Sequence, residues 1–147
     1  MKITLLGSGD TIGTPIPACE CITCQDTNQK SARTRFGMLI EEGDEKILFD
    51  TNPDLHWQCV RHKLRLETIG NVFITHTHSD HLNGMGEFCV RRPSPTVVHY
   101  GNNPITIRNI EYFRYLEWEK VMSFKSYETN EKIIIGEKLH VTPIVLN

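Results

Sequence analysis

The chain has 147 residues, enough for one domain with a hydrophobic core, since a chain of this size buries about 70% of its unfolded surface. Its formal net charge is −2 and 23% of its residues are charged, so it lacks the overall basic field that holds a long nucleic acid. No apolar run approaches the roughly 18 residues of a membrane span, and no secretory signal follows Met1. We therefore expect one cytoplasmic domain (1–147) that contacts no membrane, with nucleic acid a disfavoured partner.

The first predicted strand, residues 2–6, leads into a glycine-rich connection over residues 7–15. A phosphate-binding loop is the disfavoured alternative there, because the pattern is not G-x-x-x-x-G-K-[ST] and no well-capped helix follows.

Three of the five cysteines form a C-x-C-x-x-C cluster: Cys19, Cys21 and Cys24. This spacing is too tight for mutual disulfides, whereas three thiolates can surround one tetrahedral zinc ion that takes its fourth ligand from elsewhere. We predict a structural zinc site, and free cysteines in a loop are the alternative.

A basic stretch, residues 30–35, is predicted to be a solvated loop in preference to a contact for an anionic substrate. Two apolar segments, 36–40 and 46–50, then flank a charged turn, which predicts a β-hairpin. A helix is predicted over residues 52–65, with Asn52 as its cap and Pro53 in its first turn. The apolar face predicted for this helix consists of Trp57, Val60 and Leu64.

An apolar strand over residues 72–75 precedes the run His76-Thr77-His78-Ser79-Asp80-His81. Two residues apart in extended backbone, His76 and His78 point to the same side and can converge on one metal ion, which leaves Asp80 and His81 for a second. A carboxylate beside imidazoles suits Zn, Mn or Fe, and two ions held by one short segment are typical of a hydrolytic centre. The alternative, that these side chains only pack, is disfavoured because clustered polar groups cost stability unless they are paired.

Further along the chain, the patterns predict a short helix over 82–90, a strand over 96–100 and a helix over 103–119. Two closing strands are predicted over 132–135 and 139–146.

The run at 76–81 resembles the H-x-H-x-D-H signature of the metallo-β-lactamase superfamily. Three further segments, Gly13-Thr14-Pro15, the cysteine cluster and Leu48-Phe49-Asp50-Thr51, stand in the order seen in one branch of it. That branch contains the phosphoribosyl 1,2-cyclic phosphate phosphodiesterases. The resemblance covers essentially the whole chain.

The resemblance implies an α/β (α+β) fold, the αββα sandwich, of which this chain would hold mostly the N-terminal half. It implies that Asp50 accepts hydrogen bonds that orient the ligand loop, although a capping carboxylate at the strand end is the alternative reading. It also places a third metal-binding histidine, a bridging aspartate, another histidine and the fourth ligand of the cysteine site downstream of residue 147. We therefore expect a longer protein, and a homodimer or segment-exchanged oligomer that covers exposed surface.

The activity implied is metal-dependent hydrolysis of a small phosphodiester, with Asp80 and His81 in the catalytic centre and Asp80 as a ligand rather than a free base. A tRNA 3′-processing nuclease of the same superfamily is the nearest alternative. Against it, the loop at 50–54 departs from that family's acidic, glycine-containing version, and no basic substrate arm is visible. A non-catalytic metal-binding or assembly module is the alternative from another class.

Overall fold

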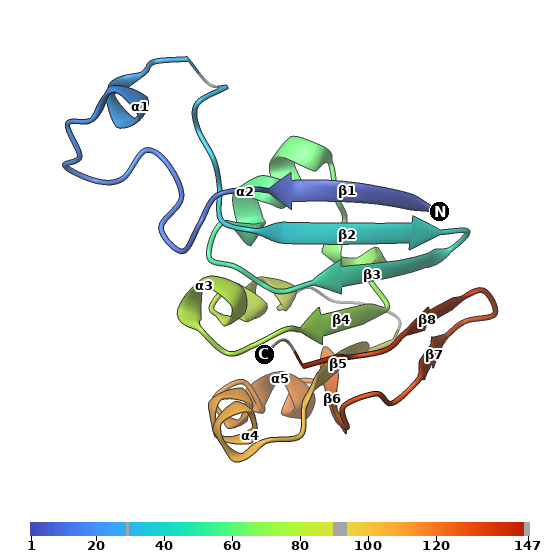
Figure 1. Ribbon diagram of the computed structural model, residues 1–147. Helices are drawn as coiled ribbons and strands as arrows, with labels where there is room; N and C mark the ends of the chain where they lie inside the picture. Colours follow the sequence, from blue (N-terminus) through green and yellow to red (C-terminus); the bar gives the residue numbers. More distant parts are fainter. Residues whose placement is uncertain (29, 90–93, 146–147) are drawn as a thin grey trace.

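A six-stranded mixed sheet, in the order β1-β2-β3-β4-β5-β6, forms the centre of the computed structural model, which describes residues 1–28, 30–89 and 94–145 (Figure 1). Its strands are β1 (Lys2–Gly7), β2 (Gly37–Glu42), β3 (Glu45–Phe49), β4 (Asn71–Ile74), β5 (Thr96–Gly101) and β6 (Met122–Tyr127). Antiparallel pairing joins β1 to β2 and β2 to β3, which confirms the predicted hairpin, and parallel pairing joins β3 through β6. The carboxyl ends of four neighbouring strands therefore lie along one edge, where ligands commonly bind in open α/β sheets.

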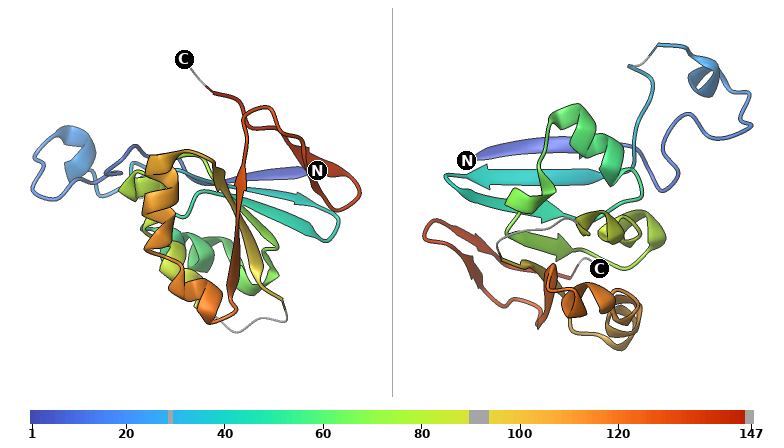
Figure 2. Two further views of the ribbon diagram at one scale, coloured as in Figure 1. Left: turned by 90° about the horizontal axis from the view of Figure 1, so that it is seen from below. Right: turned by 180° about the vertical axis from the view of Figure 1, so that it is seen from behind.

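One face of this sheet carries most of the helices, whereas β7 and β8 lie over the other face (Figure 2). The helices are α1 (Ile22–Gln25), α2 (Leu55–His62), η1 (Leu66–Thr68), α3 (Ser79–Leu82), η2 (Met85–Phe88), α4 (Pro104–Glu111) and α5 (Tyr115–Trp118). The core between helices and sheet is centred on Leu48, Val72 and Val98, which are register neighbours on three strands and are fully buried. Apolar residues buried on both faces of parallel strands agree with the predicted α/β class.

The opposite face of the sheet is covered in part by the hairpin of β7 (Ile133–Ile135) and β8 (Leu139–Val141). Ile135 of this hairpin packs with Ile47 and Phe73 in a second, smaller cluster. Ile3 and Leu5 remain more than half exposed. Among the described residues, no helix has the length and apolar character needed to cross a bilayer.

The helix predicted over 52–65 is shorter, and its predicted cap is wrong. It begins at Leu55, and Asn52 is fully buried with its side-chain amide donating to the Phe36 carbonyl at 2.8 Å. The Asn52 side-chain oxygen instead accepts the backbone N–H of Asp54 at 2.8 Å, which closes a turn ahead of the helix. The carboxyl end of the helix is set by Lys63, which takes the left-handed conformation.

The predicted apolar face of α2 is also wrong, since Trp57 is 67% exposed and Val60 is 59% exposed. The side of the helix that meets the sheet carries Leu55 and the polar Gln58 instead. The amide of Gln58 donates to the Arg35 carbonyl at 2.8 Å and to the Thr34 hydroxyl at 3.0 Å, so its burial is compensated by hydrogen bonds. Hydrophobic periodicity does not detect a helix face that is anchored by a buried amide.

The helix predicted over 103–119 is two helices, α4 and α5. Its predicted start is confirmed, and Asn103 caps α4 by accepting the Thr106 N–H on Oδ1 at 3.0 Å. Strand β6 was not predicted, because half of its side chains are exposed or polar and its apolar alternation is weak. The last predicted strand, 139–146, is confirmed only for Leu139–Val141.

The helix predicted over 82–90 corresponds to the end of α3 and the separate turn η2. Val90, where that prediction ended, and Leu146, where the last predicted strand ended, lie outside the described residues.

A buried histidine on β5 has no part in the metal-binding motif. His99 is 6% exposed, its ring stacks on Phe73 at 4.3 Å, and its Nε2 lies 2.9 Å from Asn71 Oδ1. Burial, helped by the positive charge of Lys125, lowers the pKa of His99 from 6.5 to about 4. The folded protein therefore disfavours a proton that the unfolded chain accepts.

This difference predicts how stability depends on pH. Because the pKa of His99 is lower in the folded state, its neutral form stabilises the fold fully above about pH 6.5, and that contribution is lost as the pH falls to about 4. We expect a loss of about 2–3 kcal/mol over this range. Urea unfolding at pH 7, 5 and 4 measures it, and His99→Gln should flatten the profile. An equally steep profile in the variant would show that other groups cause the loss.

Candidate metal centre

Three imidazole rings come together where β4 leaves the sheet. His76 follows the strand, His78 immediately precedes α3 in extended conformation, and His81 lies inside that helix. The ring centroids of His76 and His78 are 4.8 Å apart, and those of His76 and His81 are 4.0 Å apart. The first two side chains are exposed, whereas Asp80 is only 8% exposed. The segment from Thr75 to His81, called the ribbon below, thus presents one open side to solvent and one buried side to the protein.

Asp50 lies behind the ribbon, fully buried at the end of β3. Its carboxylate accepts the Thr75 N–H and the Thr75 hydroxyl, each at 2.8 Å, and lies 2.7 Å from His81 Nδ1. Because an ionised carboxylate only accepts, the proton in the last contact belongs to Nδ1 of His81. The lone pair of that imidazole is then on Nε2, which lies 3.3 Å from Asp80 Oδ2.

The backbone beneath the ribbon is joined to the loop that follows Asp50. The Thr51 N–H donates to the His81 carbonyl at 2.8 Å, and the Thr51 carbonyl accepts the Gly84 N–H at 2.7 Å. A Cβ on Gly84 would lie 2.0 Å from the Asn52 carbonyl oxygen, so this close approach requires glycine. The helix predicted over 82–90 includes Gly84, but that prediction does not reveal the packing of this glycine against the loop.

The donor types on the ribbon, imidazole and carboxylate, are those that divalent metals bind, although among the described residues only the three cysteines have ligand atoms that all lie within 4.8 Å of one another. Nε2 of His81 and a carboxylate oxygen of Asp80 already face each other, and the imidazoles of His76 and His78 stand beside them. Desolvation, followed by the neighbouring charge of His81, lowers the pKa of His76 and favours the neutral imidazole that binds metals.

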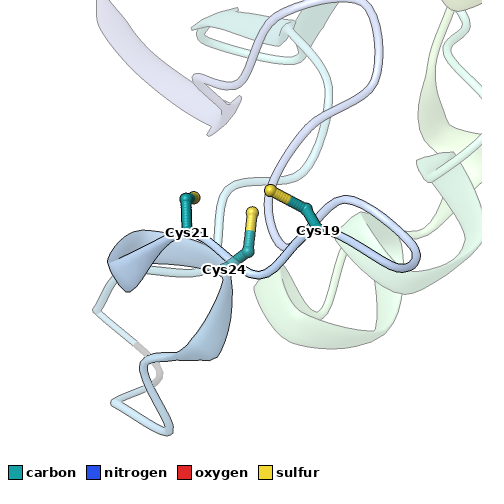
Figure 3. A group of neighbouring side chains, drawn as sticks. All are labelled: Cys19, Cys21 and Cys24. Carbon is teal, nitrogen blue, oxygen red and sulfur yellow. The ribbon is translucent and has the colours of Figure 1, made fainter.

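The second candidate site is the cysteine cluster, on an arm that extends away from the sheet (Figure 1). The sulfur atoms of Cys19, Cys21 and Cys24 lie within 4.8 Å of one another, with Cys24 on the short helix α1 (Figure 3). Cys24 Sγ accepts the Ile16 N–H at 3.3 Å. Hydrogen bonding, first from the backbone of Cys24, lowers the pKa of Cys21 to about 7, which favours the thiolate form. This cluster could bind a metal ion.

A pocket of about 840 Å³ adjoins the ribbon at the carboxyl edge of the sheet. Its lining includes Thr75 and His76 of the ribbon, the aromatic rings of Phe49, Phe73 and Tyr127, and residues 141–145. The volume is in the range typical of small-molecule sites.

The fold and this site define the class of protein. The sequence-family model of the metallo-beta-lactamase superfamily matches residues 34–146, and the chain belongs to this superfamily. This confirms the assignment suggested by the H-x-H-x-D-H motif.

Among solved structures, the chain is similar to a diphosphatase from the PhnP family, with 25% identity and a TM-score of 0.72 over 90% of this chain and 53% of that one. It is similar in fold to Zn(2+)-bound PqqB from Methylobacterium extorquens, with 20% identity and a TM-score of 0.73 over 90% of this chain and 51% of that one. It is also similar in fold to the short form of human tRNase Z, with 22% identity and a TM-score of 0.56 over 88% of this chain and 46% of that one.

Among curated proteins, a stretch of 88 residues is 33% identical to an octanoyltransferase of Porphyromonas gingivalis, covering 59% of this chain and 18% of that protein. A stretch of 69 residues is 35% identical to a ribonuclease Z of Lacticaseibacillus casei, covering 47% of this chain and 20% of that protein. The chain thus spans about half the length of the similar structures and about a fifth of the curated relatives that it matches.

Proposed function

We propose that this chain belongs to a metal-dependent phosphodiesterase that hydrolyses a small, preferably cyclic, phosphate ester. The observation that carries the proposal is the ribbon with its buried support: His76, His78, Asp80 and His81 gathered at one strand end, with Asp50 behind them. The likeness to a diphosphatase of the PhnP family supports chemistry at a phosphate group.

In this proposal His76 and His78 hold one ion, and Asp80 and His81 hold the other. Divalent ions bound there supply a water of lowered pKa and neutralise charge that develops on phosphoryl oxygens. Asp50 retains the proton on Nδ1 of His81, so that Nε2 keeps its lone pair for the ion. Asp80 is a ligand and not a general base, because its carboxylate is nearly buried against that Nε2. Zinc, manganese and iron all suit this donor set.

The pocket beside His76 offers space for the organic part of the substrate. Its aromatic side chains suit a small ring or planar group. Since His76 lines the pocket, the phosphate end of the substrate would face the ribbon in this proposal. With a formal net charge of −2, the chain has no overall field that would attract a polyanion.

A nuclease is the second candidate, favoured by the likeness to ribonuclease Z and to tRNase Z. One experiment separates the alternatives. The full-length protein, loaded with Mn²⁺ or Zn²⁺, is assayed on phosphoribosyl 1,2-cyclic phosphate, on an aryl phosphodiester and on a precursor tRNA. We expect hydrolysis of the first two that is abolished by a chelator and restored by metal. Preferential cleavage of the tRNA would favour the nuclease, and metal binding without hydrolysis would favour a non-catalytic module.

We further propose that Cys19, Cys21 and Cys24 hold a structural zinc ion. All four residues of α1 are described and none is buried, so packing contributes little to the order of this arm and a metal would supply what is missing. The prediction is that Cys21→Ser lowers the zinc content of the full-length protein by one ion per chain, measured by mass spectrometry of the metal. Cys89→Ser, which also removes an exposed thiol, should leave the content unchanged. Equal zinc in both variants would contradict the site.

Cytoplasmic location and self-association stay predictions. The exposed apolar side chains of Ile3 and Leu5 support association, because they lie on the sheet face that β7 and β8 cover only in part.

A further inference from the structure

The part of the ribbon that carries the first two histidines is poorly shielded. Thr75, His76 and His78 are all exposed, and only Thr77 between the histidines is partly buried. An exposed segment of this kind samples many conformations unless hydrogen bonds restrain it, and each conformation separates the imidazoles differently. The geometry of the site therefore depends on what holds the segment from outside.

A helix remote in sequence supplies one such restraint. Asn109 of α4 donates from its side-chain amide to the Thr77 hydroxyl at 2.8 Å, across 32 residues of sequence. Both side chains are partly buried, so water competes less for this bond than at an open surface. The helix itself is fixed, since Asn103 caps its start and Ile110, next to Asn109, is 1% exposed in the core. Asn109 thus connects a rigid element to the residue between the two histidines.

A second restraint holds the point where the ribbon begins. The Tyr127 hydroxyl of β6 donates to the carbonyl of Ile74, the last residue of β4, at 3.1 Å. Strand β5 lies between β4 and β6, and its Gly101 is the register partner of Tyr127. A Cβ added to Gly101 would lie 3.8 Å from the tyrosine ring, so the ring passes close to this glycine on its way to β4. The start of the ribbon is therefore anchored by Tyr127 and Asp50, and its middle by Asn109.

We propose that Asn109 is a positioning residue for the metal centre: by holding the Thr77 hydroxyl it sets the separation of the His76 and His78 imidazoles. The bond reaches the residue between the ligands and uses no imidazole nitrogen, so it restrains the backbone without competing for the metal. This inference rests on the proposed metal-binding function. It predicts that the bond contributes to metal affinity through geometry alone.

The test measures the affinity of the full-length protein for Mn²⁺ by calorimetry, because this ion prefers nitrogen and oxygen ligands to the thiolates of the cysteine cluster. Thr77→Val removes the hydroxyl at nearly constant volume, and Asn109→Ala removes the amide. We expect each to weaken Mn²⁺ binding about tenfold, as is usual when a group that orients a ligand is lost. The double variant should be no weaker than either single one, because both changes break one bond. Thr77→Ser should restore binding, and Arg108→Ala, on the same helix, should have no effect.

Unchanged affinity in Thr77→Val, or a hundredfold loss in the double variant, would overturn the inference. Hydrogen exchange of the amides at 75–78 in the metal-free chain provides an independent measurement. Exchange should be faster in Asn109→Ala and in Thr77→Val, and normal in Thr77→Ser. If the unmodified full-length protein binds no Mn²⁺, the proposed function fails. Unchanged exchange in Asn109→Ala would show, independently of metal, that Asn109 does not restrain the segment.

Discussion

Replacing His78 with alanine should lower the rate of phosphodiester hydrolysis by the metal-loaded full-length protein by a factor of roughly a thousand or more. The reason is that the ring centroids of His78 and His76 are 4.8 Å apart at the open side of the site, and these two histidines are the proposed ligands of one ion. Loss of one imidazole from such a pair removes the ion at ordinary metal concentrations, and with it the means of acidifying water. Steady-state rates, measured for both proteins at the lowest Mn²⁺ concentration that fully activates the unmodified protein, give the size of the effect.

The matched control is His62→Ala, which removes an exposed histidine at the end of α2. This variant should retain the full rate. High metal concentration should recover part of the activity of His78→Ala, since the remaining ligands bind the ion weakly. A His78→Ala protein as active as the control would show that the ribbon is not the catalytic centre, whatever its geometry.

Replacing Asp50 with alanine should lower the free energy of unfolding by about 3–5 kcal/mol. The fully buried carboxylate accepts from the Thr75 N–H, the Thr75 hydroxyl and Nδ1 of His81, and each donor would lose its partner. The backbone of Asp50 is also left-handed, with φ of 63°, a conformation that alanine tolerates poorly. Urea unfolding of the metal-free protein measures the loss. Asp44→Ala, in the exposed turn between β2 and β3, is the control and should change little.

Asp50→Asn separates the support of the metal site from the support of the fold. Asparagine accepts left-handed backbone and keeps the shape, so most of the stability should remain. In this variant an NH₂ group takes the place of the carboxylate oxygen that faces the Thr75 hydroxyl and His81 Nδ1. Because an NH₂ group donates and does not accept, the proton of His81 is no longer held on Nδ1. We expect Mn²⁺ affinity to fall about 10- to 100-fold. If Asp50→Ala proves as stable as Asp44→Ala, the carboxylate does not support the loop at all.

The sequence by itself determined the features whose information is local. His76, His78, Asp80 and His81 lie within six residues, and the cysteine cluster is equally compact, so spacing alone identified both groups. The hairpin of β2 and β3 and the start of α4 after Asn103 follow from the same kind of short-range pattern. These predictions depend on backbone geometry over a few residues, which neighbouring side chains largely decide.

The tertiary structure decided how those groups are held. The contacts of Asp50 with Thr75 and His81 and of Asn109 with Thr77 join residues 25 to 32 positions apart, and no sequence periodicity encodes such pairs. The same limit explains the wrong face of α2, where one buried amide outweighed the apolar pattern, and the missed strand β6, whose pairing with β5 supplies order that its own residues do not indicate. Burial and hydrogen bonding between distant segments decide these features, because their free energy appears only once the chain has brought the partners together.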